Sequence, residues 1–205
     1  MKKLLLLLAF GITGTLAAAN IAVAQQPAAD ASHALQLPGM TEEHRMLLPL
    51  AGDWTITGRT YKGCPYGEGT FTAVEHCEWM RGGQFLVCRT QYSELFKNSS
   101  QIAFIGVDAK TKEMTYSLYS SLGVTVSATG SLRDKEKKAL VGNSIEWTQK
   151  QINVSMHGDQ QEMKYTTELV SLSQYKFSLR AIGPGGGAWY DGIASRVGEV
   201  INPQQ

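Results

Sequence analysis

The chain has 205 residues and a nearly balanced charge, with 19 Lys and Arg against 18 Asp and Glu and a formal net charge of +1. This balance argues against a nucleic-acid partner, which usually requires a basic surface. A chain of this length can bury a substantial core without a metal, and three cysteines are too few for a disulfide scaffold. Composition therefore indicates an ordinary globular protein and leaves its function open.

The first 24 residues have the form of a secretory signal peptide. Lys2 and Lys3 precede an apolar run that begins at Leu4, and Ala22–Ala24 offers the small residues of a cleavage site. Because the apolar run is short for a membrane span, we expect cleavage, no membrane anchor afterwards, and a mature protein that is periplasmic or secreted. Loss of the two lysines changes the net charge from +1 to −1.

The segment after the predicted cleavage site divides into a leader and a folded domain. Residues 25–40 are rich in Ala and Gln and predict a flexible leader. Thr41–Leu50 then predicts a short helix, with Thr41 as its N-cap and Pro49 near its end. We find no second domain and no repeat, so residues 41–200 are expected to form one domain.

From residue 51 onward the chain alternates strand-like runs with tight turns, which is typical of an all-β sandwich or barrel. Hairpin connections favour a single antiparallel up-and-down β-barrel of about ten strands, because closure removes exposed strand edges. The expected strands are Trp54–Tyr61, Gly69–Met80, Gln84–Ser93, Gln101–Val107, Glu113–Ser120, Val124–Leu132, Lys138–Thr148, Gln151–His157, Glu162–Ser171, Tyr175–Ile182 and Trp189–Val197.

The strongest hairpin signal is the pair Gly82 and Gly83 between two strand-like runs. A turn centred on this pair sets Cys77 opposite Cys88, and facing residues lie within the Cα separation of about 4.4–6.8 Å that a disulfide requires. Export favours oxidation. The sequence therefore predicts a Cys77–Cys88 disulfide with Cys64 free, while a Cys64–Cys77 pair and three reduced cysteines remain alternatives.

Alternation gives the same hairpin two faces. One face carries His76, Glu78 and Arg89, and the other carries Phe71, Ala73, Cys77, Trp79, Leu86, Cys88 and Tyr92. We expect the apolar face to point to the core and the polar face to solvent. The competing interpretation makes the polar face the lumen of the barrel, where Glu78 and Arg89 would anchor the head group of a ligand.

Several segments resemble one known family. A helix followed by Gly52-Asp53-Trp54 resembles the lipocalin and fatty-acid-binding superfamily, the calycins. Cys77-Glu78-Trp79, Val87-Cys88 and Ile105–Met114 resemble a bacterial lipocalin-like family catalogued as domain of unknown function 1579. The resemblance implies an exported calycin barrel without an established activity. One departure is Ser120–Gly123, where members of the family often carry an acidic residue.

The resemblance also implies how one end of the barrel is closed. In calycins the Trp of the Gly-x-Trp motif packs into the closed end of the barrel, and an Arg late in the chain often lies across its ring, a cation–π contact. We therefore expect Trp54 to be buried beneath Arg196, with Arg180 as the alternative.

The sequence contains no spacing of residues that is typical of a metal site, a phosphate loop or a catalytic site. His33, His44, His76 and His157 lack the spacing of zinc ligands. The glycine-rich run Gly183–Gly187 lacks the Lys-Ser/Thr ending of a phosphate loop. We therefore expect no catalytic residue, no metal site and no cofactor, and we do not expect an enzyme.

The leading functional hypothesis is an exported, non-catalytic barrel that binds a small, largely apolar molecule in a cavity of about 300 Å³ or more. The alternative is a barrel with a filled lumen, which acts through its outer surface as a protein-interaction or structural module. A third hypothesis is a haem or redox protein, in which a His such as His157 would project into the lumen.

Overall fold

The computed structural model describes residues 40–198 except 138, 155–161 and 184–185, and it leaves the side chains of Glu94 and residues 149–154 undescribed. The predicted signal peptide over residues 1–24 lies outside the described residues, as do almost all of the predicted leader, His33 and His157. Within the described part of the chain, no helix is both long and apolar enough to cross a membrane.

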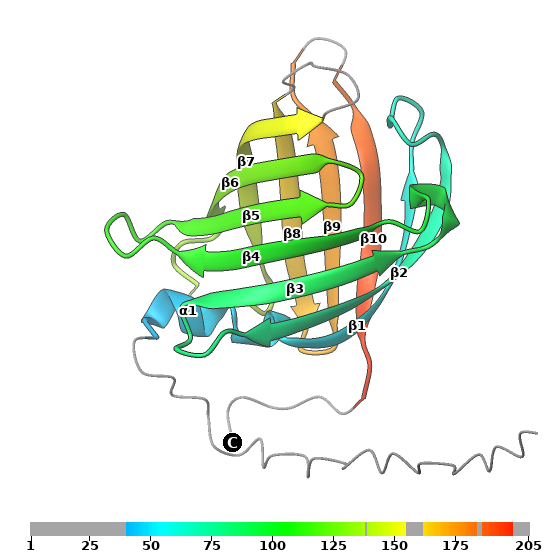
Figure 1. Cartoon of the computed structure of the whole chain (residues 1–205). Coiled ribbons are helices and arrows are strands. Elements are labelled where there is room, and N and C mark those ends of the chain that lie inside the picture. Colours follow the sequence, from blue (N-terminus) through cyan, green and yellow to red (C-terminus); the bar gives the residue numbers. More distant parts are fainter. Residues whose placement is uncertain (1–39, 138, 155–161, 184–185, 199–205) are drawn as a thin grey trace, which may run out of the picture. The chain divides into compact units, whose positions relative to one another are not determined.

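The described chain forms a closed barrel of ten antiparallel strands, as predicted (Figure 1). Each strand pairs with its neighbours in the sequence and β1 pairs with β10, so the sheet has no free edge. The elements are α1 (Glu42–Met46), a 3-10 turn (Leu48–Leu50), β1 (Gly52–Thr60), β2 (Gly69–Trp79), β3 (Phe85–Tyr92), a second 3-10 turn (Glu94–Phe96), β4 (Ser100–Val107), β5 (Met114–Ser120), β6 (Val124–Leu132), β7 (Asn143–Val154), β8 (Met163–Ser171), β9 (Gln174–Ala181) and β10 (Ala188–Arg196).

The predicted elements differ from the observed ones in two places. The runs Lys138–Thr148 and Gln151–His157 were expected as separate strands, but a single strand, β7, starts only at Asn143 and continues through Gln149 and Lys150. The register of β6 against β7 shifts by one residue at Lys150, so a bulge accommodates the interruption. The expected helix is also split into α1 and a 3-10 turn, because Pro49 lacks the N–H that a longer α-helix would need.

Alternation along β2 decides which face of the hairpin lines the lumen. Phe71, Ala73 and Cys77 are buried, whereas Val74 and His76, which point the other way, are exposed. The β2–β3 hairpin thus turns its apolar face inward and its polar face to solvent. The competing interpretation, with a polar face in the lumen, is wrong.

The end of the barrel near α1 is closed around Trp54, whose side chain is 1% exposed. Its indole N–H donates a hydrogen bond of 3.0 Å to the carbonyl oxygen of Leu50. Arg196 is the register partner of Trp54 across β1 and β10, and its guanidinium carbon lies 4.3 Å from the centroid of the Trp54 ring. Arg180, the alternative, is exposed near the other end of β9.

Arg196 also joins several segments at this end. Its guanidinium donates hydrogen bonds to the carbonyl oxygens of Pro49, Ala51 and Leu172, at 2.6, 2.7 and 2.8 Å. Gly52 has a φ of +128°, and a Cβ at this position would collide with the guanidinium. The glycine of the Gly-x-Trp motif is therefore required both by the backbone conformation and by the position of Arg196.

Candidate functional site

The barrel interior contains a cavity of about 160 Å³, and all ten strands contribute lining residues. Its walls are mostly apolar or aromatic. Large rings fill much of the lumen: the ring centroids of Phe71 and Phe177 are 6.5 Å apart, and those of Phe177 and Tyr190 are 6.1 Å apart. These rings are the reason why the cavity is smaller than the expected volume of about 300 Å³. Its size excludes a lipid-sized ligand in this conformation.

Glu75 places a carboxyl group in this apolar wall. It is the only acidic residue among the described residues that line the cavity, and none of them is Lys, Arg or His. The hydroxyl of Tyr175 donates a hydrogen bond of 2.6 Å to Oε1, and the hydroxyl of Thr90 donates one of 2.7 Å to Oε2. Burial raises the pKa of Glu75, and these two hydrogen bonds oppose the rise without cancelling it.

Six tyrosines line the cavity together with this carboxyl group. They are Tyr66 in the loop between β1 and β2, Tyr92 on β3, Tyr116 on β5, Tyr165 on β8, Tyr175 on β9 and Tyr190 on β10. Burial raises the pKa of each of these phenols above its ordinary value, so all six hydroxyls are neutral at physiological pH. The site therefore combines one carboxyl group with neutral hydroxyls and aromatic rings.

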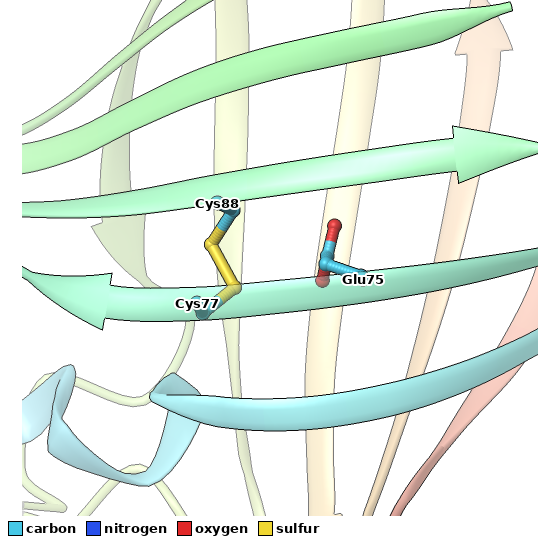
Figure 2. Close-up of side chains that lie close together, drawn as sticks. All are labelled: Glu75, Cys77 and Cys88. Atoms are coloured by element: carbon cyan, nitrogen blue, oxygen red, sulfur yellow. A yellow bond between two sulfur atoms is a disulfide. The ribbon is translucent and has the colours of Figure 1, made fainter. Parts of the chain in front are cut away.

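The predicted disulfide between Cys77 and Cys88 is present and lies beside Glu75 on the same wall (Figure 2). The two sulfur atoms and a carboxylate oxygen of Glu75 all lie within 4.8 Å of one another, which is close enough for three metal ligands. A thiolate is the form of cysteine that binds metal. Because the sulfurs are bonded to each other, Glu75 alone offers a metal ligand atom within this group.

Cys64, predicted to be free, is unpaired and buried in the loop between β1 and β2. It lines the cavity, and burial raises the pKa of its thiol. A buried, protonated thiol is a poor nucleophile. In this conformation Cys64 is therefore not placed to link two chains.

Glu78 and Arg89, the residues predicted to anchor a ligand, lie on the outer face of the barrel. Arg89 Nη1 donates a hydrogen bond of 2.6 Å to Glu78 Oε1, and both side chains are more than half exposed. This hydrogen bond lowers the pKa of Glu78. The prediction that they contact a ligand in the lumen is wrong, because the alternation of β2 and β3 turns both positions outward.

Glu75 was not predicted as a site residue, although its position in the strand pattern is unusual. Glu75 has the same parity as Phe71, Ala73 and Cys77, and all three of these face the lumen. An acidic residue within the apolar half of an alternating strand is unusual, because burying a carboxylate costs free energy. The acidic residue at an inward-facing position of β2 is therefore the sequence signal that could have identified the site.

The sequence pattern of a family described as "Protein of unknown function (DUF1579)" matches residues 40–197. The chain belongs to this family. The match to DUF1579 spans the barrel from α1 to the end of β10.

No curated protein sequence matches this DUF1579 protein. A similar solved structure is the crystal structure of Rv2717c from M. tuberculosis, with a TM-score of 0.58 and 14% identity. The similarity covers 77% of this chain and 99% of that chain. At this level of identity the comparison shows a shared fold and nothing about a ligand.

Proposed function

We propose that this protein is an exported, non-catalytic barrel that binds a small, largely apolar molecule in its lumen. The observation that carries the proposal is the cavity of about 160 Å³, with apolar and aromatic walls and one polar cluster around Glu75. Ligand sites usually combine apolar walls with a few placed polar groups. An apolar cavity of about 150 Å³ holds benzene, so the proposed ligand has a body of about one ring.

Two further observations support parts of this proposal. Among the described residues that line the cavity, Glu75 has neither a second carboxyl group nor a His beside it, the partners that acid–base catalysis commonly uses. The Cys77–Cys88 disulfide supports export, because such bonds persist in oxidising compartments. A relation to the calycins belongs to the same proposal, supported by the closed barrel and the contact between Trp54 and Arg196.

The test is an NMR titration of the protein with toluene and indole as single-ring and two-ring probes. We expect toluene, whose single ring fits the cavity, to give saturable shifts of amide signals at the cavity residues Ala103, Phe177 and Tyr190, and indole to bind more weakly. Signals of Val74 and Tyr119, which line a groove on the outer wall, should not move. An absence of saturable shifts at the cavity residues would contradict the proposal.

A pair of variants separates the lumen from the outer wall. Ala103 is buried and lines the cavity, so Ala103→Leu should fill part of the space and weaken probe binding at least about tenfold. Val74 is 58% exposed, so Val74→Leu adds a methylene group at the surface and should leave binding unchanged.

The alternative function, a barrel that acts through its outer surface, also has a specific observation in its favour. Val74 and Tyr119 are 58% and 53% exposed, and with Ile102 they line one groove on the outer wall. Exposed apolar groups of this kind are typical of interaction sites when they form a continuous patch. Failure of every probe to bind in the lumen would favour this alternative.

The haem hypothesis depends on a residue outside the described part of the chain. No His is among the described residues that line the cavity, and His157 lies in the undescribed segment 155–161. A His-ligated haem would need that residue together with a wider lumen. Absorption spectroscopy of protein purified from its own host tests this hypothesis, because a bound haem gives a Soret band.

A further inference from the structure

The carboxyl group of Glu75 has no charged partner among the described residues around it. Its oxygens accept hydrogen bonds from the neutral hydroxyls of Thr90 and Tyr175, and the described cavity lining contains no Lys, Arg or His. An ionised carboxylate in an apolar environment is costly unless an opposite charge compensates it. Once ionised, Glu75 is therefore a negative charge without a matching positive one among the described residues that line the cavity.

Aromatic rings lie on several sides of the same space. Tyr116 and Tyr165 have ring centroids 6.1 Å apart, and Phe177 lies 6.3 Å from Tyr175 and 6.1 Å from Tyr190. All five residues line the cavity. The face of an aromatic ring attracts a cation within about 6 Å of its centroid, and the attraction increases when the cation is desolvated. A ring face turned to the cavity would therefore attract positive charge for a reason that is independent of Glu75.

From these two features we propose that the ligand is a small organic cation, an amine or quaternary ammonium group on a body of about one ring, with Glu75 as its counter-ion. This inference rests on the proposed function and specifies the class of ligand. A ligand with a carboxylate head group has the wrong charge, because it would meet Glu75 with no basic residue to offset the repulsion among the described lining residues.

Binding of such a cation is coupled to the protonation of Glu75. In the empty cavity burial raises the pKa of Glu75, and a nearby positive charge lowers it again. The other titratable groups that line the cavity are the thiol of Cys64 and six tyrosines: Tyr66, Tyr92, Tyr116, Tyr165, Tyr175 and Tyr190. Because burial raises the pKa of the thiol and of each tyrosine, they stay neutral where Glu75 titrates. Affinity for a cation should therefore increase with pH through the pKa of Glu75 and then level off.

The experiment compares three probes of nearly equal size by calorimetric titration of the protein: benzylammonium, benzyl alcohol and benzoate. We expect benzylammonium to bind about tenfold more tightly than benzyl alcohol near neutral pH, and benzoate to bind most weakly. Affinity for benzylammonium should fall as the pH is lowered through the pKa of Glu75, while affinity for benzyl alcohol stays constant.

Two matched variants locate the effect. Glu75→Gln keeps the shape of the side chain and removes its charge, so it should abolish the preference for the cation and retain the binding of benzyl alcohol. Glu78→Gln makes the same change three residues later on the outer face, where the side chain is exposed, and should change none of the three affinities. If Glu75→Gln does not fold, the pH dependence of the wild-type protein provides the same test.

The outcomes distinguish this inference from the function on which it rests. If benzyl alcohol binds in the lumen and benzylammonium binds no more tightly, the cation inference is overturned while the proposed function stands. A preference for the cation that persists in Glu75→Gln, or that does not change with pH, overturns the inference as well. If no probe binds, the proposed function itself fails.

Discussion

Glu75 and Glu78 lie three residues apart on β2 and occupy opposite environments. Glu78 is exposed and accepts a hydrogen bond from Arg89, which lowers its pKa. Glu75 faces the lumen and accepts hydrogen bonds from two neutral hydroxyls, and burial raises its pKa. One residue type therefore has two roles on a single strand, and the direction of the side chain decides between them. Substitutions on the two faces test this difference between the inside and the outside of the barrel.

The largest expected difference between the inner and outer faces is the loss of free energy of unfolding when a side chain is truncated. Trp54 is 1% exposed and packs at the closed end of the barrel, so Trp54→Ala should lower the free energy of unfolding by about 3–5 kcal/mol. Val74→Ala, at a position 58% exposed on the outer face, should change it by less than about 0.5 kcal/mol. Urea denaturation measures both, and equal losses would contradict the assignment of the two faces.

The next largest effect is expected from the Cys77–Cys88 disulfide on the inner wall, which joins residues separated by 11 positions. A loop of this length stabilises the fold by about 3 kcal/mol at most in the chain-entropy model. Denaturation with and without a reductant should show this loss in the wild-type protein. A Cys64→Ala control should show the same loss, whereas a variant with both Cys77 and Cys88 changed to Ala should be insensitive to reductant.

Arg196 and Arg180 provide a matched pair near the ends of neighbouring strands. Arg196 donates hydrogen bonds to three backbone carbonyls and lies over Trp54, while Arg180 is exposed. Arg196→Ala should lower the free energy of unfolding by about 1.5–3 kcal/mol, the range for hydrogen bonds to a charged group. Arg180→Ala should have little effect. A larger loss of stability from Arg180→Ala than from Arg196→Ala would contradict the assignment of Arg196 to the closed end of the barrel.

The smallest expected effect is a difference in pH dependence between the two glutamates. Glu75 has a raised pKa in the folded state, so its contribution to stability is fully present below the pKa of the unfolded chain and is lost as pH increases through the folded pKa. Glu78 has a lowered pKa, so its contribution is present above the unfolded pKa and is lost as pH falls through the folded pKa.

Denaturation of Glu75→Gln and Glu78→Gln over roughly pH 4–8 measures this difference. Stability of the wild-type protein relative to Glu75→Gln should decrease with increasing pH. The stability of the wild-type protein relative to Glu78→Gln should instead increase with increasing pH at the acidic end of this range. Parallel pH profiles for the two variants would contradict the opposite shifts.

Much of the fold followed from local patterns in the sequence. The hairpin turn at Gly82 and Gly83 set the register of β2 against β3, and with it the pairing of Cys77 with Cys88. Other features could not be found in this way. No turn residue in the sequence marks the bulge at Lys150. The volume of the cavity depends on how side chains from all ten strands pack together.

The candidate site shows why residue type alone misled the prediction. Glu78 and Arg89 were chosen because they carry charge, although charged residues with outward parity are typical of solvent-facing positions. Glu75 has inward parity, and its neighbours Tyr175 and Thr90 lie on other strands, with Tyr175 100 residues away in the sequence. The anomaly was visible in the sequence, but the partners that explain it required the closed barrel.

The most direct test of the inner-face site is an NMR titration of the glutamate side-chain carboxyl carbons, assigned with Glu75→Gln and Glu78→Gln. From the ordinary value of 4.5, we expect the pKa of Glu75 to be raised and that of Glu78 to be lowered. Saturating benzylammonium should lower the pKa of Glu75 and leave that of Glu78 unchanged. A Glu75 carboxyl group that titrates at or below the ordinary value in the empty protein would contradict the account.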